Sequence, residues 1–297
     1  MSLKMTVRVI DTGFFKLDGG AMFGVVPKTI WQRLEEPDED NLCTWAMRCL
    51  LVQTEHGRNI LIDTGIGTKQ SEKFFSHYQP HGDASLYSSL AMHGLTPHDI
   101  TDVLLTHLHF DHVGGAVKHD VDGNPVLSFP NATYWCSDKQ WAEATMPNPR
   151  EQASFLLENL LPLEASGQLK FIEAAPYDAQ TRWFSNFNLL FAYGHTNGMI
   201  LPYLMIDGKK VVYCADLIPS PSHIRIPYVM AYDMHPAQTL IEKAYFLERA
   251  LAEEWILVFE HAKSAEAATV KRDERGRIVI DKIDTLDAFL EQDDIFA

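Results

Sequence analysis

One short segment carries four side chains that can bind metal ions. Residues 106–115 read Thr-His-Leu-His-Phe-Asp-His-Val-Gly-Gly and follow a run of apolar residues. Imidazole nitrogens and carboxylate oxygens are ligands of zinc and similar divalent ions. His107 and His109 can point the same way from an extended segment, whereas the adjacent Asp111 and His112 diverge. The segment therefore predicts two neighbouring ion sites.

Three further candidate ligands lie at or just past the ends of apolar segments that we expect to be strands. They are His195, Asp216 and His261. Because strand ends can lie together at one edge of a sheet, we expect these three side chains to contribute to one shared site. Asp63 also ends an apolar segment, and a buried carboxylate needs a partner. We expect it to orient a ligand histidine through the second ring nitrogen, or else to cap the loop that follows.

The elements that must position these side chains alternate between strands and helices. The patterns predict strands over 6–10, 43–53, 59–62, 132–136, 169–172, 189–193, 200–206, 210–214, 255–259, 268–271 and 277–280. They predict helices over 69–77, 86–93, 138–144, 151–161, 238–253 and 286–291. Residues 14–28 read as an ordered loop, either packed on the surface or bordering a pocket. We expect one continuous α/β domain over residues 1–297, with helices outside packed sheets.

The composition limits the classes of partner. The 297 residues are 46% hydrophobic and 22% charged, with a net charge of −15. This balance argues against binding the phosphate backbone of nucleic acids. No segment has the length or apolarity of a membrane span, and the start lacks the pattern of a signal peptide, so we expect a cytoplasmic protein that acts on a small molecule. The four cysteines form no Cys-x-x-Cys pair and are expected to be reduced, and residues 1–3 are expected to be a leader.

The metal-competent side chains follow one another in a recognisable order. They are His107, His109, Asp111, His112, His195, Asp216 and His261. This set, with the strand that ends in Asp63-Thr64-Gly65, resembles the metallo-β-lactamase superfamily. The resemblance implies an αββα sandwich, an α/β fold of four layers with two sheets face to face and two divalent ions at one edge. It also implies that one ion is held by His107, His109 and His195. The other ion would be held by Asp111, His112 and His261, and Asp216 would bridge the two ions.

Within the superfamily the chain is similar to the quorum-quenching N-acyl-homoserine lactonases over residues 17–28 and 106–115. The resemblance implies hydrolysis of a lactone ring by a hydroxide held between two ions, with Asp111 or Asp216 relaying the proton. Zinc is the expected ion, and Mn, Fe and Co accept the same ligands. A homodimer is also compatible with the resemblance.

The substrate pocket is expected to draw on apolar and aromatic side chains from several segments. The candidates are Met22, Phe23, Phe155, His223, Tyr228 and Tyr232. The best-known lactonases carry a tyrosine shortly after the bridging aspartate, whereas this chain reads Asp-Leu-Ile-Pro-Ser over residues 216–220. Tyr228 or Tyr232 is the candidate replacement.

Other functions remain open at this stage. Phosphotriester hydrolysis of the methyl-parathion-hydrolase type needs the same two ions and differs in the shape of the pocket. A glyoxalase-type thioesterase would want a basic C-terminal region, and the tail after His261 is short and mixed in charge. An iron-dependent dioxygenase would keep one ion only, and a non-catalytic metal-binding module would not depend on Asp216. β-Lactam hydrolysis is disfavoured because the ligand set differs.

Overall fold

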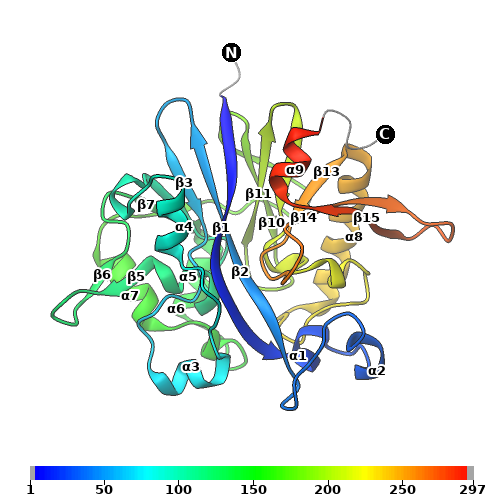
Figure 1. The fold of residues 1–297 in the computed structure, drawn as a ribbon, viewed down its shortest axis with the longest axis horizontal. Coiled ribbons are helices and arrows are strands. Elements are labelled where there is room, and N and C mark those ends of the chain that lie inside the picture. Colours follow the sequence, from blue (N-terminus) through cyan, green and yellow to red (C-terminus); the bar gives the residue numbers. More distant parts are fainter. Residues whose placement is uncertain (1–3, 293–297) are drawn as a thin grey trace.

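Two β-sheets lie face to face, and helices cover the outer side of each (Figure 1). The computed structural model describes residues 4–292, so the expected leader lies outside the described residues. The four-layer arrangement confirms the predicted αββα sandwich. No helix in the described part of the chain is long and apolar enough to cross a membrane.

The first sheet has the strand order β1-β2-β3-β4-β7-β8. Its strands are β1 (Met5–Asp18), β2 (Leu42–Thr54), β3 (Asn59–Ile62), β4 (Asp102–Leu104), β7 (Thr133–Ser137) and β8 (Leu169–Ile172). β1, β2 and β3 pair antiparallel, whereas β3, β4, β7 and β8 pair parallel. Parallel pairing aligns the carboxyl ends of β3 and β4 at one edge.

The second sheet has the order β15-β14-β13-β12-β11-β10-β9. Its strands are β9 (Thr181–Phe184), β10 (Phe187–Ala192), β11 (Met199–Ile206), β12 (Lys209–Tyr213), β13 (Trp255–Val258), β14 (Ala267–Arg272) and β15 (Ile278–Asp284). Only β12 and β13 pair parallel among the described strands of this sheet, so their carboxyl ends also lie together. A separate hairpin pairs β5 (Val117–His119) with β6 (Pro125–Leu127).

Helices lie outside the two sheets, with α4 to α7 on one side and α8 on the other (Figure 1). The α-helices are α1 (Gly19–Phe23), α2 (Lys28–Trp31), α3 (Glu72–Tyr78), α4 (Leu86–Met92), α5 (Phe110–Val113), α6 (Asp138–Thr145), α7 (Leu157–Ala165), α8 (Pro236–Glu253) and α9 (Leu286–Glu291). Short 3₁₀ turns are η1 (Pro97–Asp99), η2 (Gly114–Ala116), η3 (Gln152–Ser154), η4 (Ala215–Leu217) and η5 (Pro221–His223).

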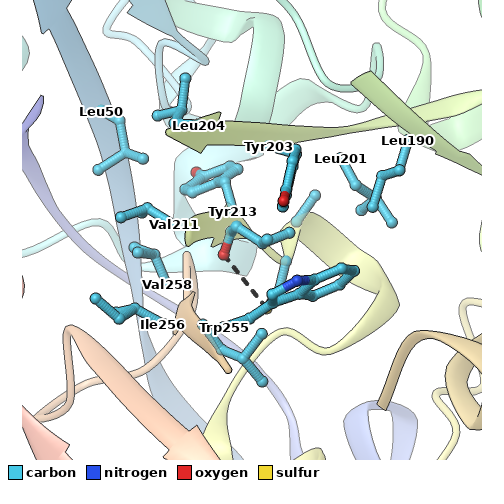
Figure 2. Packing of buried hydrophobic residues seen from close by; sticks show 14 of the residues in the cluster. Leu50, Leu190, Leu201, Tyr203, Leu204, Val211, Tyr213, Trp255, Ile256 and Val258 are labelled. Atoms are coloured by element: carbon cyan, nitrogen blue, oxygen red, sulfur yellow. Dashed lines mark hydrogen bonds between the residues drawn. The ribbon is translucent and has the colours of Figure 1, made fainter. Parts of the chain in front are cut away.

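The core between the sheets is apolar. Leu50 of the first sheet packs with Leu204, Val211 and Val258 of the second in one buried cluster (Figure 2). The Tyr213 hydroxyl crosses the layer and donates to the carbonyl oxygen of Arg48 at 2.5 Å. The buried cluster joins both sheets, so the strand ends are held in fixed relative positions.

Two predicted elements differ from the structure. The strand predicted over 6–10 continues through a bulge to Asp18, so part of the expected loop at 14–28 is strand and the rest forms α1 and α2. The helix predicted over 151–161 is wrong, because η3 and α7 are separated at the buried Phe155, which takes an extended conformation. The ring of Phe155 packs 4.9 Å from that of His109, and this tertiary contact outweighs local helix propensity.

Candidate metal centre

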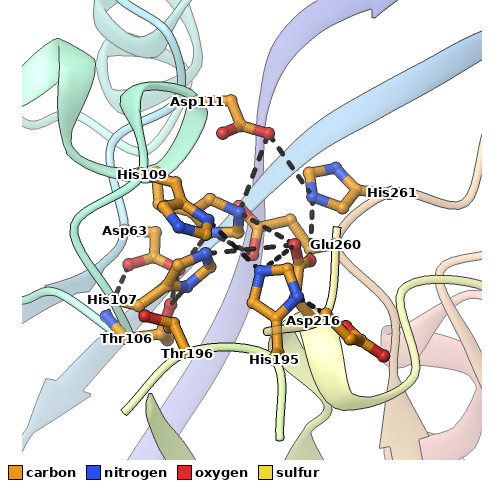
Figure 3. Close-up of polar contacts among 12 residues, drawn as sticks. Asp63, Thr106, His107, His109, Asp111, His195, Thr196, Asp216, Glu260 and His261 are labelled. Carbon is orange, nitrogen blue, oxygen red and sulfur yellow. Dashed lines mark hydrogen bonds and ion pairs between the residues drawn. The ribbon is translucent and has the colours of Figure 1, made fainter. Parts of the chain in front are cut away.

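Strands from both sheets end at one edge and present polar side chains there (Figure 3). β4 leads into the segment of His107 and His109, and β10 ends three residues before His195. β12 and β13 end just before Asp216 and His261, respectively. The two sheets are thus the reason why residues more than a hundred positions apart meet.

The turn after His109 depends on two glycines. α5 places Asp111 and His112 one turn further on, and the backbone of η2 then passes close to residues 64–66. A Cβ at Gly114 or Gly115 would collide with the carbonyl oxygens of Ile66 and Thr64. The Thr64 amide and hydroxyl both donate to the His112 carbonyl oxygen, at 2.8 and 2.7 Å. The close approach fixes the backbone that carries His112.

The seven predicted ligands form overlapping groups whose candidate ligand atoms lie within 4.8 Å of one another. These groups are His107–His109–His195, His107–His112–Asp216 and Asp111–His112–His261. Asp216 lies between them, with Oδ2 at 3.1 Å from His195 Nε2 and Oδ1 at 3.0 Å from His261 Nε2. Such an arrangement could hold two divalent ions with Asp216 between them.

Each imidazole has a partner for the nitrogen that faces away from the cluster. His109 Nε2 lies 3.0 Å from Glu151 Oε1, and His195 Nδ1 lies 2.8 Å from Asp233 Oδ1. His261 Nδ1 donates to the Ala46 carbonyl oxygen at 2.7 Å. These contacts set the tautomer and the ring orientation, as is usual for metal-binding histidines.

His112 has two carboxylates on its outer side. Its Nδ1 lies 3.2 Å from Asp63 Oδ2 and 3.0 Å from Glu260 Oε2. Asp63 also accepts from the Thr106 amide and hydroxyl, at 2.7 and 2.6 Å, and its backbone has a φ of +59°. Asp63 thus lies where it can orient the His112 ring. Its hydrogen bonds to Thr106 also connect the end of β3 to the start of the segment that carries the ligands.

The cluster shifts the pKa values of its own members in opposite directions. Burial and then the neighbouring His112 hold the pKa of His107 well below its usual value. Burial also opposes protonation of His195, but the Asp216 carboxylate outweighs it and raises the pKa to about 10. Burial favours the neutral form of Asp216, yet the surrounding imidazoles hold its pKa well below the usual range. Asp216 is therefore ionised and available as an anionic ligand.

Several polar atoms inside the cluster lack a hydrogen-bond partner. They are His107 Nε2, His112 Nε2, His261 Nε2 and Asp216 Oδ1. Buried polar atoms without a partner are costly, and metal coordination removes that cost. The orphaned nitrogens and the acidic oxygens have the chemistry that zinc and related ions require, so the residues fit a two-ion centre.

A cavity of about 130 Å³ opens over the cluster. Its lining includes His109, Asp111, His195, Asp216 and His261. The remaining lining residues are Leu17, Met22, Tyr78, Phe110, Arg150, Glu151, Ser154, Met230, Ala231, Tyr232 and Met234. The candidate ligands therefore face a space that a small molecule can enter.

Of the expected pocket residues, Met22 and Tyr232 line this cavity. Phe23 and His223 do not: they stack on each other with centroids 4.5 Å apart, and the Phe23 ring meets Tyr228 edge-on. Phe155 packs behind His109. None of these four side chains lines this cavity: Phe23, His223 and Tyr228 belong to a packed aromatic layer, and Phe155 contacts His109 instead.

The orienting carboxylates Glu151, Asp233 and Glu260 were not predicted from the sequence. Glu260 immediately precedes His261 at a strand end, and that position could have drawn attention to it. Burial raises the pKa of Glu260 to about 7, although His112 lowers it. Glu151 and Asp233 lie in irregular segments, where sequence pattern says little about direction.

The chain matches known proteins over most of its length. The model of the metallo-beta-lactamase superfamily matches residues 48–261. A probable metal-dependent hydrolase from Staphylococcus aureus is 29% identical with a TM-score of 0.83, over 95% of this chain and 98% of that one. AidC, a dizinc quorum-quenching lactonase, is 23% identical with a TM-score of 0.73, over 95% of both chains. An N-acyl homoserine lactone hydrolase with N-hexanoyl-L-homoserine bound is 21% identical with a TM-score of 0.67, over 89% of this chain and 95% of that one.

The family match spans well over half of the chain and includes all seven candidate ligands. The two sheets and the strand ends that meet at one edge form the αββα sandwich described above. This chain belongs to the metallo-beta-lactamase superfamily.

Proposed function

We propose that this protein is a dinuclear metal-dependent hydrolase that opens the ring of a lactone, with an N-acyl-homoserine lactone as the starting candidate. The observation that carries the proposal is Asp216, which faces two groups of metal-competent side chains on the floor of an accessible cavity. The similarity to structures of lactonases supports a lactone, among esters, as the first substrate to test.

The proposed ligand assignment follows the geometry of the cluster. One ion would be held by His107, His109 and His195, and the other by Asp111, His112 and His261. Asp216 would contact both. When bound, two zinc ions or similar divalent ions supply Lewis acidity and activate water near neutral pH.

Residues of the chain would do the remaining work. Asp111 and Asp216 both line the cavity, and their carboxylates can accept a proton during ring opening. Glu151 and Asp233 keep two imidazoles in place, so the ligand geometry need not change during the reaction.

Tyr232 is the proposed counterpart of the tyrosine that lactonases carry near the bridging aspartate. It lines the cavity, and its hydroxyl has no hydrogen-bond partner within residues 4–292. Burial raises the pKa of Tyr232 above its usual value, so the hydroxyl stays protonated and can donate to a substrate oxygen. Tyr228 lies off the cavity, against Phe23.

A paired assay on one preparation tests the proposal. Metal content per chain is measured together with turnover of N-hexanoyl-homoserine lactone, an aryl ester, paraoxon and a glutathione thioester. We expect two ions per chain and a preference for the lactone. A preference for paraoxon would keep the two-ion centre and make the protein a phosphotriesterase, whereas one iron without hydrolysis would overturn the proposal.

A further inference from the structure

A rigid turn brings a positive charge to the wall of the cavity. Among residues 4–292, Arg150 is the only lysine or arginine that lines it. The Asn148 side-chain oxygen accepts from the amides of Arg150 and Glu151, at 3.0 and 3.1 Å. Prolines flank Asn148 on both sides. The turn that directs Glu151 to His109 therefore also fixes the backbone of Arg150.

The guanidinium group of Arg150 is only partly engaged. One of its Nη2 hydrogens is donated to the carbonyl oxygen of Ala231, which also lines the cavity. No carboxylate within the described residues forms an ion pair with it. A guanidinium carries five N–H donors in a planar fork, so most of them remain available to a ligand.

Every acidic group that lines the cavity already has a partner in the protein. Asp111 and Asp216 lie among the imidazoles. Glu151 contacts His109 and accepts from the Asn148 side chain at 3.1 Å. The rest of the lining is apolar or carries neutral hydroxyls. Away from the cluster, the uncompensated charge that meets a ligand is the positive charge of Arg150.

We propose that Arg150 selects substrates that carry an anionic group, such as a carboxylate at the end of the acyl part. This inference rests on the proposed function and narrows it to lactones with an acidic acyl group. A carboxylate matches the fork of a guanidinium in a bidentate pair. The hydrogen bond to Ala231 uses one N–H donor of Arg150 but does not change the charge of the guanidinium group. The group can therefore still form an ion pair with a carboxylate.

Two lactones of equal chain length test the inference. N-hexanoyl-homoserine lactone is neutral, and N-(5-carboxypentanoyl)-homoserine lactone differs by a terminal carboxylate. We expect the native enzyme to favour the acidic lactone in kcat/KM by about 10-fold or more, as for a charged hydrogen-bonded pair. In Arg150→Met this ratio should fall to about one, and in Arg150→Lys it should be intermediate because the charge remains without the fork.

Arg275→Met is the matched control, since Arg275 is exposed in the turn between β14 and β15. It should keep the native ratio. Metal content and thermal midpoint are measured for each variant, so that loss of the centre or of the fold is separated from loss of selectivity. A native ratio near one, or an unchanged ratio in Arg150→Met, would overturn the inference while leaving lactone hydrolysis in place.

A binding measurement separates this inference from the proposed function. The two ring-opened products are titrated calorimetrically into the metal-loaded enzyme. Tighter binding of the acidic product that is lost in Arg150→Met supports anion selection even if neither lactone is turned over. Equal binding of both products by the native enzyme overturns it.

Discussion

The edge that carries the candidate ligands and the wall of the cavity above it are built differently. The ligand edge consists of strand ends joined by two sheets, and each imidazole is held by a second contact. The cavity wall comes from the end of β1 with α1, at residues 17–22, and from the turns at 150–154 and 230–234. Two hydrogen bonds to backbone carbonyls connect these segments. The Ala231 amide donates to the Ala21 carbonyl oxygen at 2.8 Å, and the Arg150 guanidinium donates to the Ala231 carbonyl oxygen.

The difference separates what the fold determines from what it leaves free. The ligand edge cannot shift without disturbing the core, whereas the wall can change by loop substitutions at little cost. Reaction type is therefore expected to follow the edge, and substrate choice the wall. The predictions below test that division.

Removing Asp216 should have the largest effect. Asp216→Ala takes away the carboxylate that faces both groups of ligands. Because its loss leaves the imidazoles without their shared anion, we expect metal content to fall below two ions and kcat/KM to drop by about 10²-fold or more. Metal analysis and lactone turnover measure this. Glu274→Ala, at an exposed position, should change neither.

Glu151 tests the division directly, because it belongs to a wall turn and acts on a ligand. Glu151→Gln keeps the shape but removes the charge that faces His109 Nε2 at 3.0 Å. We expect metal affinity to weaken by about 10- to 100-fold at one of the two sites. Competition with a chelator measures it, with Glu158→Gln on the exposed side of α7 as the control. Unchanged metal affinity would mean that the turn of Glu151 shapes the cavity wall and does not affect metal binding through His109.

The sequence predicted the ligand edge because strand ends and metal-competent side chains coincide there. A buried strand is recognised in the sequence as a run of apolar residues. The residue that follows it lies at the edge of the sheet, whatever the conformation of the next loop. This is why His195, Asp216 and His261 could be proposed as partners of the segment at 107–112. The face-to-face arrangement of two sheets was expected from the family resemblance, and the order of the strands was not predicted, since pairing between distant strands leaves little local signal.

The wall was harder to predict, for a physical reason. Phe23 and His223 have the size and polarity of pocket residues, yet each is fully buried in the aromatic layer below. Arg150 reaches the cavity from a turn whose direction depends on tertiary contacts such as that of Asn148 with Glu151, and Tyr78 reaches it from the end of α3. Composition can suggest which side chains suit a pocket, but loop geometry decides which of them line it.

A buried lysine of α8 holds residues 225–228, the segment that precedes the wall residues 230–234, and this predicts a pH effect on stability. Lys243 Nζ donates to the carbonyl oxygens of Arg225 and Tyr228, each at 2.8 Å. Burial lowers the pKa of Lys243 from 10.5 to about 7. Between these values the unfolded chain binds the proton more tightly, so this group's contribution to the free energy of unfolding increases as pH rises from 7 towards 10.5.

Urea unfolding of the native protein and Lys243→Met at pH 7.5 and pH 9.5 checks this effect. The stability difference between them should grow in favour of the native protein at the higher pH, by about 2 kcal/mol. Groups that titrate in both proteins cancel in this comparison. A difference that is constant with pH would show that Lys243 stays charged in the folded protein.

The smallest expected effect concerns one hydroxyl of the wall. Tyr232→Phe removes a donor that lines the cavity and leaves the ring in place. We expect kcat/KM for the lactone to fall by about 2- to 10-fold, the scale of one hydrogen bond, with metal content unchanged. Tyr228→Phe is the matched control, because that ring packs against Phe23 and does not line the cavity. Equal losses in the two variants would show that the hydroxyl of Tyr232 does not meet the substrate and that the wall acts through packing alone.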